Sequence, residues 1–198
     1  SWGSEFGEDG FFYISYYDTN VGTHNVVYTG IENTDNYDHI YQSDLCGWVG
    51  QLGYNKETIY GANVYTAGSD ENLVAASFYA TGKDSEYQLY LVKNFENVES
   101  LSSMKPVASG KLSNAGYYTI PFEQEMAVEA GERYAVVLYI STPGAVHPLA
   151  VEYKADESTE NVILDDGEGY VSPNGFEWED VKNIEDSNIC LKVFSKNQ

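Results

Sequence analysis

The chain has 198 residues, and its 42% hydrophobic and 15% aromatic content is enough for a folded core, which excludes a disordered segment. Its 31 acidic residues outnumber 10 basic ones, and the net charge of −21 repels phosphate backbones and anionic headgroups, so neither nucleic acid nor a membrane surface is an expected partner. No stretch has the ~18 apolar residues of a membrane span, so membrane insertion is not expected, and the lack of an initiating Met and of a signal peptide is as expected of an internal fragment.

The first 17 residues carry the most specific pattern in the chain. Ser1-Trp2-Gly3 is followed by a Gly-rich turn and an aromatic run at residues 7–14, Gly-Glu-Asp-Gly-Phe-Phe-Tyr-Ile. This arrangement resembles the closing motif of papain-like cysteine peptidases, where an Asn-Ser-Trp-Gly turn carries the catalytic Asn and precedes the last barrel strand. In this chain that Asn would stand before Ser1. The resemblance implies that residues 1–17 are the remnant of a peptidase strand and that the catalytic residues lie upstream.

Residues 18–50 have a different character. They are rich in Asn, Asp, Thr and Tyr, and they lack a clear strand period before residues 26–28. We therefore expect a connector that packs on the following domain or against the missing peptidase domain.

Residues 51–198 are expected to form a single β domain. Short runs of β-branched and aromatic residues alternate with Gly, Asn and Asp turns, which is typical of antiparallel strands. The clearest runs are at residues 63–66, 73–79, 86–92, 116–120, 131–140 and 188–194. The near-continuous apolar run at residues 131–140 predicts a strand buried on both faces, and residues 97–104 predict one or two helical turns at most. The pattern predicts an all-β fold, an antiparallel, jelly-roll-like sandwich.

A hairpin is predicted at residues 169–180, Gly-Tyr-Val-Ser-Pro-Asn-Gly-Phe-Glu-Trp-Glu-Asp. We expect Asn174 and Gly175 to supply the two positive φ angles of a tight turn, with Trp178 packing back on the sheet. The frame is similar to one near the end of a lectin-like domain that follows the papain-like domain in surface proteases of clostridia and related Gram-positive anaerobes. The likeness extends over nearly the whole chain, through residues 13–18, 25–31, 47–54 and 62–65.

The resemblance implies a β-sandwich similar to carbohydrate-binding modules. It implies attachment to a cysteine peptidase that is secreted or bound to the cell wall, with the upstream peptidase domain and a cell-wall or host glycan as partners. It also implies a structural calcium ion. Fold similarity alone is weak evidence for sugar binding, so the side chains must carry the functional argument.

A catalytic triad can be drawn from Cys46, His147 and Asn174, which follow the chain order of papain's. The segment after Cys46 is too rich in Gly to form the helix whose N-terminus lowers the pKa of such a thiol. His147 precedes a proline inside a β run, and Asn174 is explained by its turn. No catalytic residue is therefore expected. Cys46 and Cys190 are too few for a disulfide scaffold, and they either pair or, as we favour, are separate buried thiols.

The candidate metal ligands in the sequence are its acidic residues and histidines. The three histidines are scattered, which argues against zinc. Calcium binds carboxylates from loops that are distant in sequence, and acids gather in two places. The candidates are Asp35, Asp38 and Asp44 in the connector and Asp165, Asp166 and Glu168 in a late loop. Neither group has the EF-hand spacing, and solvated loop acids are the simpler interpretation.

Sugar binding uses exposed aromatic rings with neighbouring polar groups. Trp48, Tyr54 and Trp178 are the candidates for a ligand surface or an interdomain surface. Trp178 is favoured as hairpin packing, whereas Trp48, between two glycines, faces the peptidase domain or a ligand. The sequence predicts a non-catalytic accessory domain that positions its peptidase by binding glycan or by docking on the catalytic domain. The alternatives are a structural spacer without ligand and a fragment of an active cysteine peptidase.

Overall fold

The computed structural model describes residues 4–5, 7–22, 26–165 and 167–198. The chain divides into two compact units, Ser1–Thr34 and Asp35–Gln198. Ser1, Trp2 and Gly3 lie outside the described residues. The boundaries predicted at residues 17 and 50 stay predictions. One short strand of the second unit, at residues 39–41, lies within the segment expected to be a connector, and a second, at residues 50–52, begins at its last residue.

The first unit consists mainly of irregular chain with exposed side chains. Glu8 and Phe11 exchange two backbone hydrogen bonds of 2.7 and 2.9 Å, which close a tight turn. Phe11, Tyr13 and Tyr16 are 77, 93 and 98% exposed. The aromatic run that resembles a peptidase strand therefore leaves these three rings unburied within its own unit.

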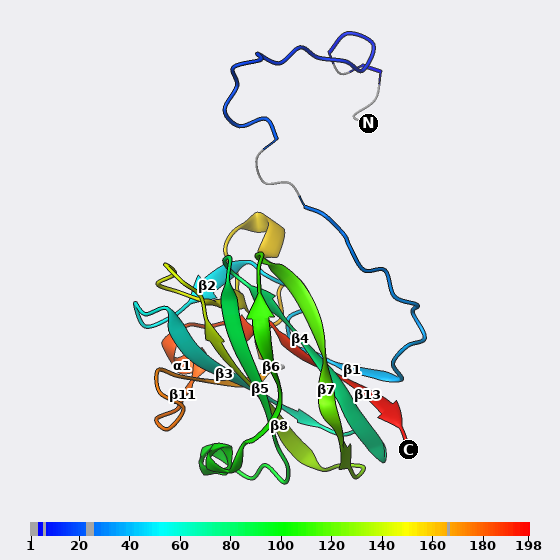
Figure 1. Cartoon of the computed structure of the whole chain (residues 1–198), viewed down its shortest axis with the longest axis vertical. Coiled ribbons are helices and arrows are strands. Elements are labelled where there is room, and N and C mark those ends of the chain that lie inside the picture. The colour runs from blue at the N-terminus through cyan, green and yellow to red at the C-terminus, as the bar shows by residue number, and fades with distance from the viewer. Residues whose placement is uncertain (1–3, 6, 23–25, 166) are drawn as a thin grey trace. The chain divides into compact units, whose positions relative to one another are not determined.

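In its described part, the second unit is built from three antiparallel sheets (Figure 1). The four-stranded sheet has the order β1 (His39–Tyr41), β13 (Leu191–Asn197), β4 (Glu71–Ala80) and β7 (Gly116–Val128). The six-stranded sheet has the order β11 (Glu179–Asp180), β10 (Glu168–Ser172), β3 (Thr58–Thr66), β8 (Arg133–Ser141), β5 (Ser85–Val92) and β6 (Lys105–Leu112). The third sheet has the order β12 (Asn188–Ile189), β9 (Leu149–Glu152) and β2 (Gly50–Leu52). The helical segments are short: η1 (Val98–Ser103), η2 (Glu157–Thr159) and α1 (Val181–Ile184).

The main core joins side chains of the four-stranded and six-stranded sheets. In β5 the side chains alternate from Ser85 to Leu91, so that Tyr87, Leu89 and Leu91 are buried on the core side while residues 86, 88 and 90 are more exposed. Phe78 of β4 packs on Tyr87 with ring centroids 5.3 Å apart. This packing confirms the predicted antiparallel sandwich.

Strand β8 is buried on both faces, as its apolar run predicts. Tyr134 and Leu138 belong to the main core, whereas Ala135 and Val137 belong to a second cluster that also holds Leu101 of η1. The second cluster covers part of the outer face of the six-stranded sheet. The helical turns predicted at residues 97–104 are this η1, which is a 3₁₀ helix.

The β10–β11 connection differs from the predicted two-residue turn. Gly175 has a φ of +78°, but Asn174 is absent from the described residues with positive φ. Instead, Asn174 Oδ1 accepts backbone hydrogen bonds from Phe176 at 2.9 Å and Glu177 at 3.0 Å. The turn is longer because the asparagine side chain, rather than its backbone angle, closes it.

The last predicted strand is broken at Cys190. The Cys190 backbone N–H donates to the Ala150 carbonyl at 3.1 Å, so β12 stays with β9 of the third sheet. From Leu191 onward the chain pairs with β4 of the four-stranded sheet. A sheet change of this kind leaves the apolar pattern of the segment intact, and the sequence therefore gives no sign of it.

Candidate binding surface

The three residues of the drawn triad serve separate local structures. The Cys46 backbone N–H donates to Glu152 Oε1 at 2.7 Å, His147 Nδ1 lies 3.2 Å from the Gly53 carbonyl, and Asn174 closes its own loop. Among the described residues, no hydrogen bond or ion pair joins any two of the three side chains. The arrangement offers no nucleophile activated by a base.

Both cysteines are free thiols, as favoured from the sequence. Cys190 is buried, and burial is the main reason that its pKa is raised. Cys46 was predicted to be buried as well, and this is wrong because its side chain is exposed. It lines a cavity of about 280 Å³ together with Leu45, Glu152 and Val162.

Asp44 is fully buried, and neither of its carboxylate oxygens accepts a hydrogen bond. Lys192 Nζ lies 3.4 Å from Asp44 Oδ2, which is an ion-pair distance. Desolvation raises the pKa of Asp44 to about 6, although the Lys192 charge opposes the shift and the nearby Glu152 adds to it. This carboxylate is therefore held in a costly environment by the fold around it.

The other connector acids lie elsewhere. Asp38 is exposed and accepts a 2.8 Å hydrogen bond from the backbone N–H of Asn197, near the end of β13. Asp44 instead pairs with Lys192, near the start of β13. Five residues of an extended strand span roughly 17 Å, so Asp38 and Asp44 do not meet around one ion. Asp35 is exposed.

The late-loop acids also separate. Glu168 forms an ion pair with Arg133 and accepts a hydrogen bond from the Tyr170 hydroxyl, while Asp165 is exposed. Asp166 lies outside the described residues. Within the part of the chain that the structure describes, no group of three or more His, Cys, Asp or Glu side chains is placed to hold a metal ion. The calcium ion stays a prediction, and Asp44 is the candidate whose buried oxygens accept no hydrogen bond, although Lys192 forms an ion pair with one of them.

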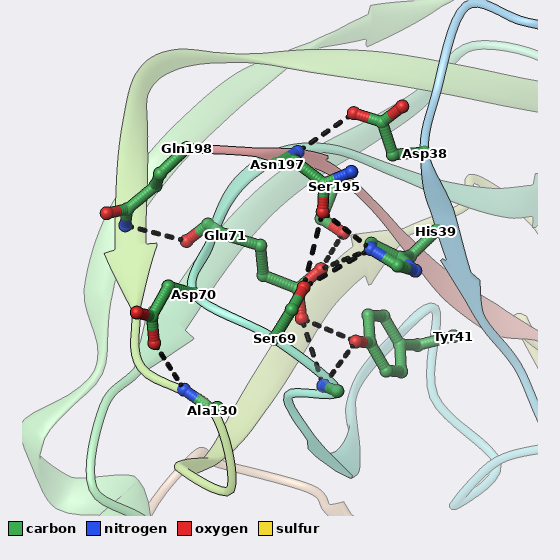
Figure 2. Close-up of polar contacts among 11 residues, drawn as sticks. Asp38, His39, Tyr41, Ser69, Asp70, Glu71, Ala130, Ser195, Asn197 and Gln198 are labelled. Atoms are coloured by element: carbon green, nitrogen blue, oxygen red, sulfur yellow. Dashed lines mark hydrogen bonds and ion pairs between the residues drawn. The ribbon is translucent and has the colours of Figure 1, made fainter.

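A second buried carboxylate, Glu71, is fully partnered. Figure 2 shows Tyr41, Ser195 and His39 converging on it at the end of the four-stranded sheet. Tyr41 and Ser195 donate hydroxyl hydrogen bonds, the Gly68 backbone donates one of 3.2 Å, and His39 Nε2 lies 3.9 Å from Oε2. Burial and Glu71 together raise the pKa of Tyr41 to about 12. These contacts join β1, β4 and β13, and we read them as structural.

The first aromatic group is the Trp178 cluster, which consists of Tyr60, Tyr139 and Trp178. The Tyr60 and Tyr139 centroids are 4.8 Å apart, and those of Tyr60 and Trp178 are 6.2 Å apart. A Cβ on Gly175 would lie 3.1 Å from the Tyr60 ring, so the β10–β11 loop approaches this tyrosine closely. Trp178 itself is partly buried against the second hydrophobic cluster.

The second aromatic group is the Trp48 cluster, which consists of Trp48, Tyr79 and Tyr117. Trp48 and Tyr79 have centroids 5.7 Å apart, and Tyr79 and Tyr117 have centroids 4.9 Å apart. Tyr79 of β4 is directly paired with Tyr117 of β7, so the two side chains share a face. The neighbouring Phe78 and Tyr118 belong to the core side, which places the Trp48 cluster on the outer face.

Tyr54, the third predicted surface residue, belongs to neither cluster. Its hydroxyl donates to Glu179 Oε2 at 2.8 Å, and its ring packs against the main core. Burial and this carboxylate raise the pKa of Tyr54. It ties the segment after β2 to β11, which is a structural role.

A further cavity lies beside the η2 loop. It has a volume of about 520 Å³ and is lined by Lys154, Glu160, Asn161, Val162, Ile163, Leu164, Asp165, Lys182 and Asp186. No aromatic side chain lines it. It therefore lacks the flat apolar faces on which sugar rings stack.

The chain matches a family model described as "Lectin like domain" over residues 40–195. It belongs to the lectin-like domain family. The match begins within β1 and ends within β13, so it spans nearly the whole second unit. No curated protein matched the chain. No helix in the described part is long and apolar enough to cross a membrane.

Two solved structures share the fold of this lectin-like domain. The first is the clostridial cysteine protease Cwp84 after propeptide cleavage, with a TM-score of 0.69 and 24% identity over 81% of this chain and 40% of that one. The second contains the cysteine protease and lectin-like domains of Cwp84, a surface-layer-associated protein of Clostridium difficile, with a TM-score of 0.62 and 24% identity over 72% and 33%. The chain thus spans less than half the length of either protein, and the likeness concerns the fold.

Proposed function

We propose that this chain is a non-catalytic accessory domain of a secreted or cell-surface papain-like cysteine peptidase. It positions the peptidase by binding cell-wall or host glycan or by docking on the catalytic domain. The observation that carries the proposal is the lectin-like match over residues 40–195. The fold is shared with Cwp84, in which a lectin-like domain accompanies a cysteine protease domain.

The contacts of the chain support a role without catalysis. Cys46, His147 and Asn174 each bond within different local structures, and the buried acids Glu71 and Asp44 are enclosed. The exposed aromatic rings include Trp48 and Tyr117. They suit recognition rather than bond cleavage.

A printed array of neutral and anionic oligosaccharides tests the proposal directly. We expect residues 1–198 to bind at least one neutral class, with an unrelated β-sandwich of similar acidity as the control for nonspecific retention. Absence of binding to every glycan, together with binding to the separately expressed peptidase domain, would move the function to docking. Absence of both would favour the structural spacer.

The coding sequence upstream of Ser1 gives an independent test. We expect it to encode a Cys-Gly-x-Cys-Trp segment, a His-containing strand and an Asn immediately before Ser1. An upstream region without these elements would contradict the proposed parent enzyme while leaving the lectin-like family membership intact.

A further inference from the structure

The Trp48 cluster keeps two large aromatic side chains in contact with solvent. Trp48 is 37% exposed and Tyr117 is 46% exposed, with the partly buried Tyr79 between them. Tyr and Trp rings that keep one face in solvent are enriched at binding interfaces. The two exposed rings flank a third that supports both.

The cluster is held in place by the backbone. Tyr79 and Tyr117 stand opposite each other in neighbouring strands, and the Tyr117 hydroxyl lies 2.5 Å from Ser77 Oγ. The Val49 N–H bonds to the Val151 carbonyl at 3.0 Å, which fixes the residue after Trp48. Rings anchored in this way lose little conformational entropy when a ligand binds.

The surroundings of the cluster favour an uncharged ligand. Lys192 follows the same outer face, but its ammonium is paired with Asp44 and bonded to Gln42 Oε1 at 2.8 Å. The net charge of −21 repels polyanions. The Thr119 side chain shares this face with Tyr117, and its hydroxyl is an uncharged group that can bond sugar hydroxyls.

The cluster also lies far from the Glu71 network. Tyr79 is eight residues from Glu71 along β4, roughly 26 Å in an extended strand. The start of β7 and the C-terminal end of β13 are at opposite ends of the sandwich (Figure 1). The chain enters the second unit beside Glu71, so the aromatic face is at the end remote from that entry.

We propose that the Trp48 cluster is a glycan-binding platform that takes uncharged pyranose units of a polysaccharide. Trp48 and Tyr117 stack against the C–H faces of the sugar, because these faces are apolar and complement the electron-rich face of an aromatic ring. Tyr79 acts as a positioning residue between them. This inference rests on the proposed function and assigns it to one surface.

The test uses the oligosaccharide array with variants of the 1–198 chain. We expect Trp48→Ala and Tyr117→Ala each to weaken binding to the best neutral glycan by at least about tenfold, as is usual for a central aromatic contact. Tyr117→Phe keeps the ring and should stay within about threefold of the wild type. Phe176→Ala is the matched control, because Phe176 is an exposed ring, 86% accessible, on the β10–β11 loop.

Circular dichroism and thermal unfolding establish that each variant is folded before it is compared. Neutral-glycan binding that survives the Trp48→Ala/Tyr117→Ala double change overturns the platform assignment and leaves the proposed glycan function standing. Selective binding of anionic glycans also overturns it. If the folded wild type binds no glycan, the proposed glycan function fails and the platform fails with it.

Discussion

The Trp48 and Trp178 clusters are built from the same parts and differ in what covers them. Each joins one tryptophan to two tyrosines, and each has a glycine with a φ near +80° beside one of those tyrosines, Gly47 and Gly175. In the Trp178 cluster, the β10–β11 loop packs against Tyr60. In the Trp48 cluster, Trp48 and Tyr117 face solvent. The same aromatic residues can therefore form either a packed cluster or an exposed one. Whether the neighbouring loop covers the rings distinguishes the two clusters.

The largest expected difference between the clusters is in stability. Trp178→Ala should lower the free energy of unfolding by about 3 kcal/mol, because it removes a ring from between the hairpin and the second hydrophobic cluster. Trp48→Ala should cost less than about 1 kcal/mol, since its ring is partly solvated already. Urea unfolding followed by circular dichroism measures both. Equal losses of unfolding free energy in the two variants would contradict the view that Trp178 serves packing whereas Trp48 belongs to an exposed binding surface.

The next prediction concerns the pH dependence of stability near the Trp48 cluster. Asp44 lies near this cluster, and its charge contributes to the raised pKa of Tyr79, which is due mainly to burial. The pKa of Asp44 is about 6 in the folded protein and 3.8 ordinarily, so the folded state binds this proton more tightly than the unfolded state. Protonation of Asp44 therefore stabilises the fold as pH falls through 6, by about 1 kcal/mol between pH 7 and 5 and about 2 kcal/mol by pH 4.

The Asp44→Asn variant isolates the contribution of this carboxyl group. The wild type should gain these amounts relative to Asp44→Asn, as measured by urea unfolding at each pH. Asp38→Asn, at an exposed carboxylate, is the matched control and should follow the wild type in this window. Parallel pH profiles for the wild type and Asp44→Asn would contradict the desolvation of Asp44.

The two glycines provide the smallest and most closely matched comparison. Gly175→Ala should cost about 1–2 kcal/mol, because an L residue is strained at φ +78° and its Cβ would press on the Tyr60 ring at 3.1 Å. Gly47→Ala should cost about 1 kcal/mol for the same backbone reason, and its Cβ would lie 3.0 Å from the Tyr79 hydroxyl.

The two glycine variants should differ in their affinity for glycan. Gly47→Ala should weaken glycan binding by displacing Trp48 or Tyr79, whereas Gly175→Ala should leave the affinity unchanged in the folded fraction. Titration of both variants with the same neutral oligosaccharide provides the measurement. A loss of affinity in Gly175→Ala would mean that the Trp178 cluster also takes part in recognition.

Local patterns in the sequence were sufficient for much of the sandwich. The apolar run around Val136 predicted a strand buried on both faces, and the run at residues 86–92 predicted a buried strand, which is β5. Both are properties of neighbouring residues. The break at Cys190 and the closure of a loop by Asn174 depend on partners distant in space or on side-chain orientation, and these were missed.

The candidate surface was only half accessible from the sequence. Trp48 stood out because it lies between two glycines, but Tyr79 and Tyr117 are 38 residues apart and meet through the register of β4 with β7. That register includes an irregularity between Leu73 and Ala75, which shifts the alignment in a way that no local pattern reveals. The burial of Asp44 was missed for a similar reason, since a connector rich in acids resembles a solvated loop.

The pairing of β1 with β13 has a mechanical consequence. The two strands are antiparallel, with Asp38 bonded to Ser195 and Asn197, so the point where the chain enters the second unit lies beside its last residues. A pulling force applied between Asp38 and Gln198 would open this edge like a zipper, breaking its hydrogen bonds in succession instead of shearing them together. The hydrogen bonds that Glu71 accepts from Tyr41 and Ser195 would be the first buried contacts to oppose this separation.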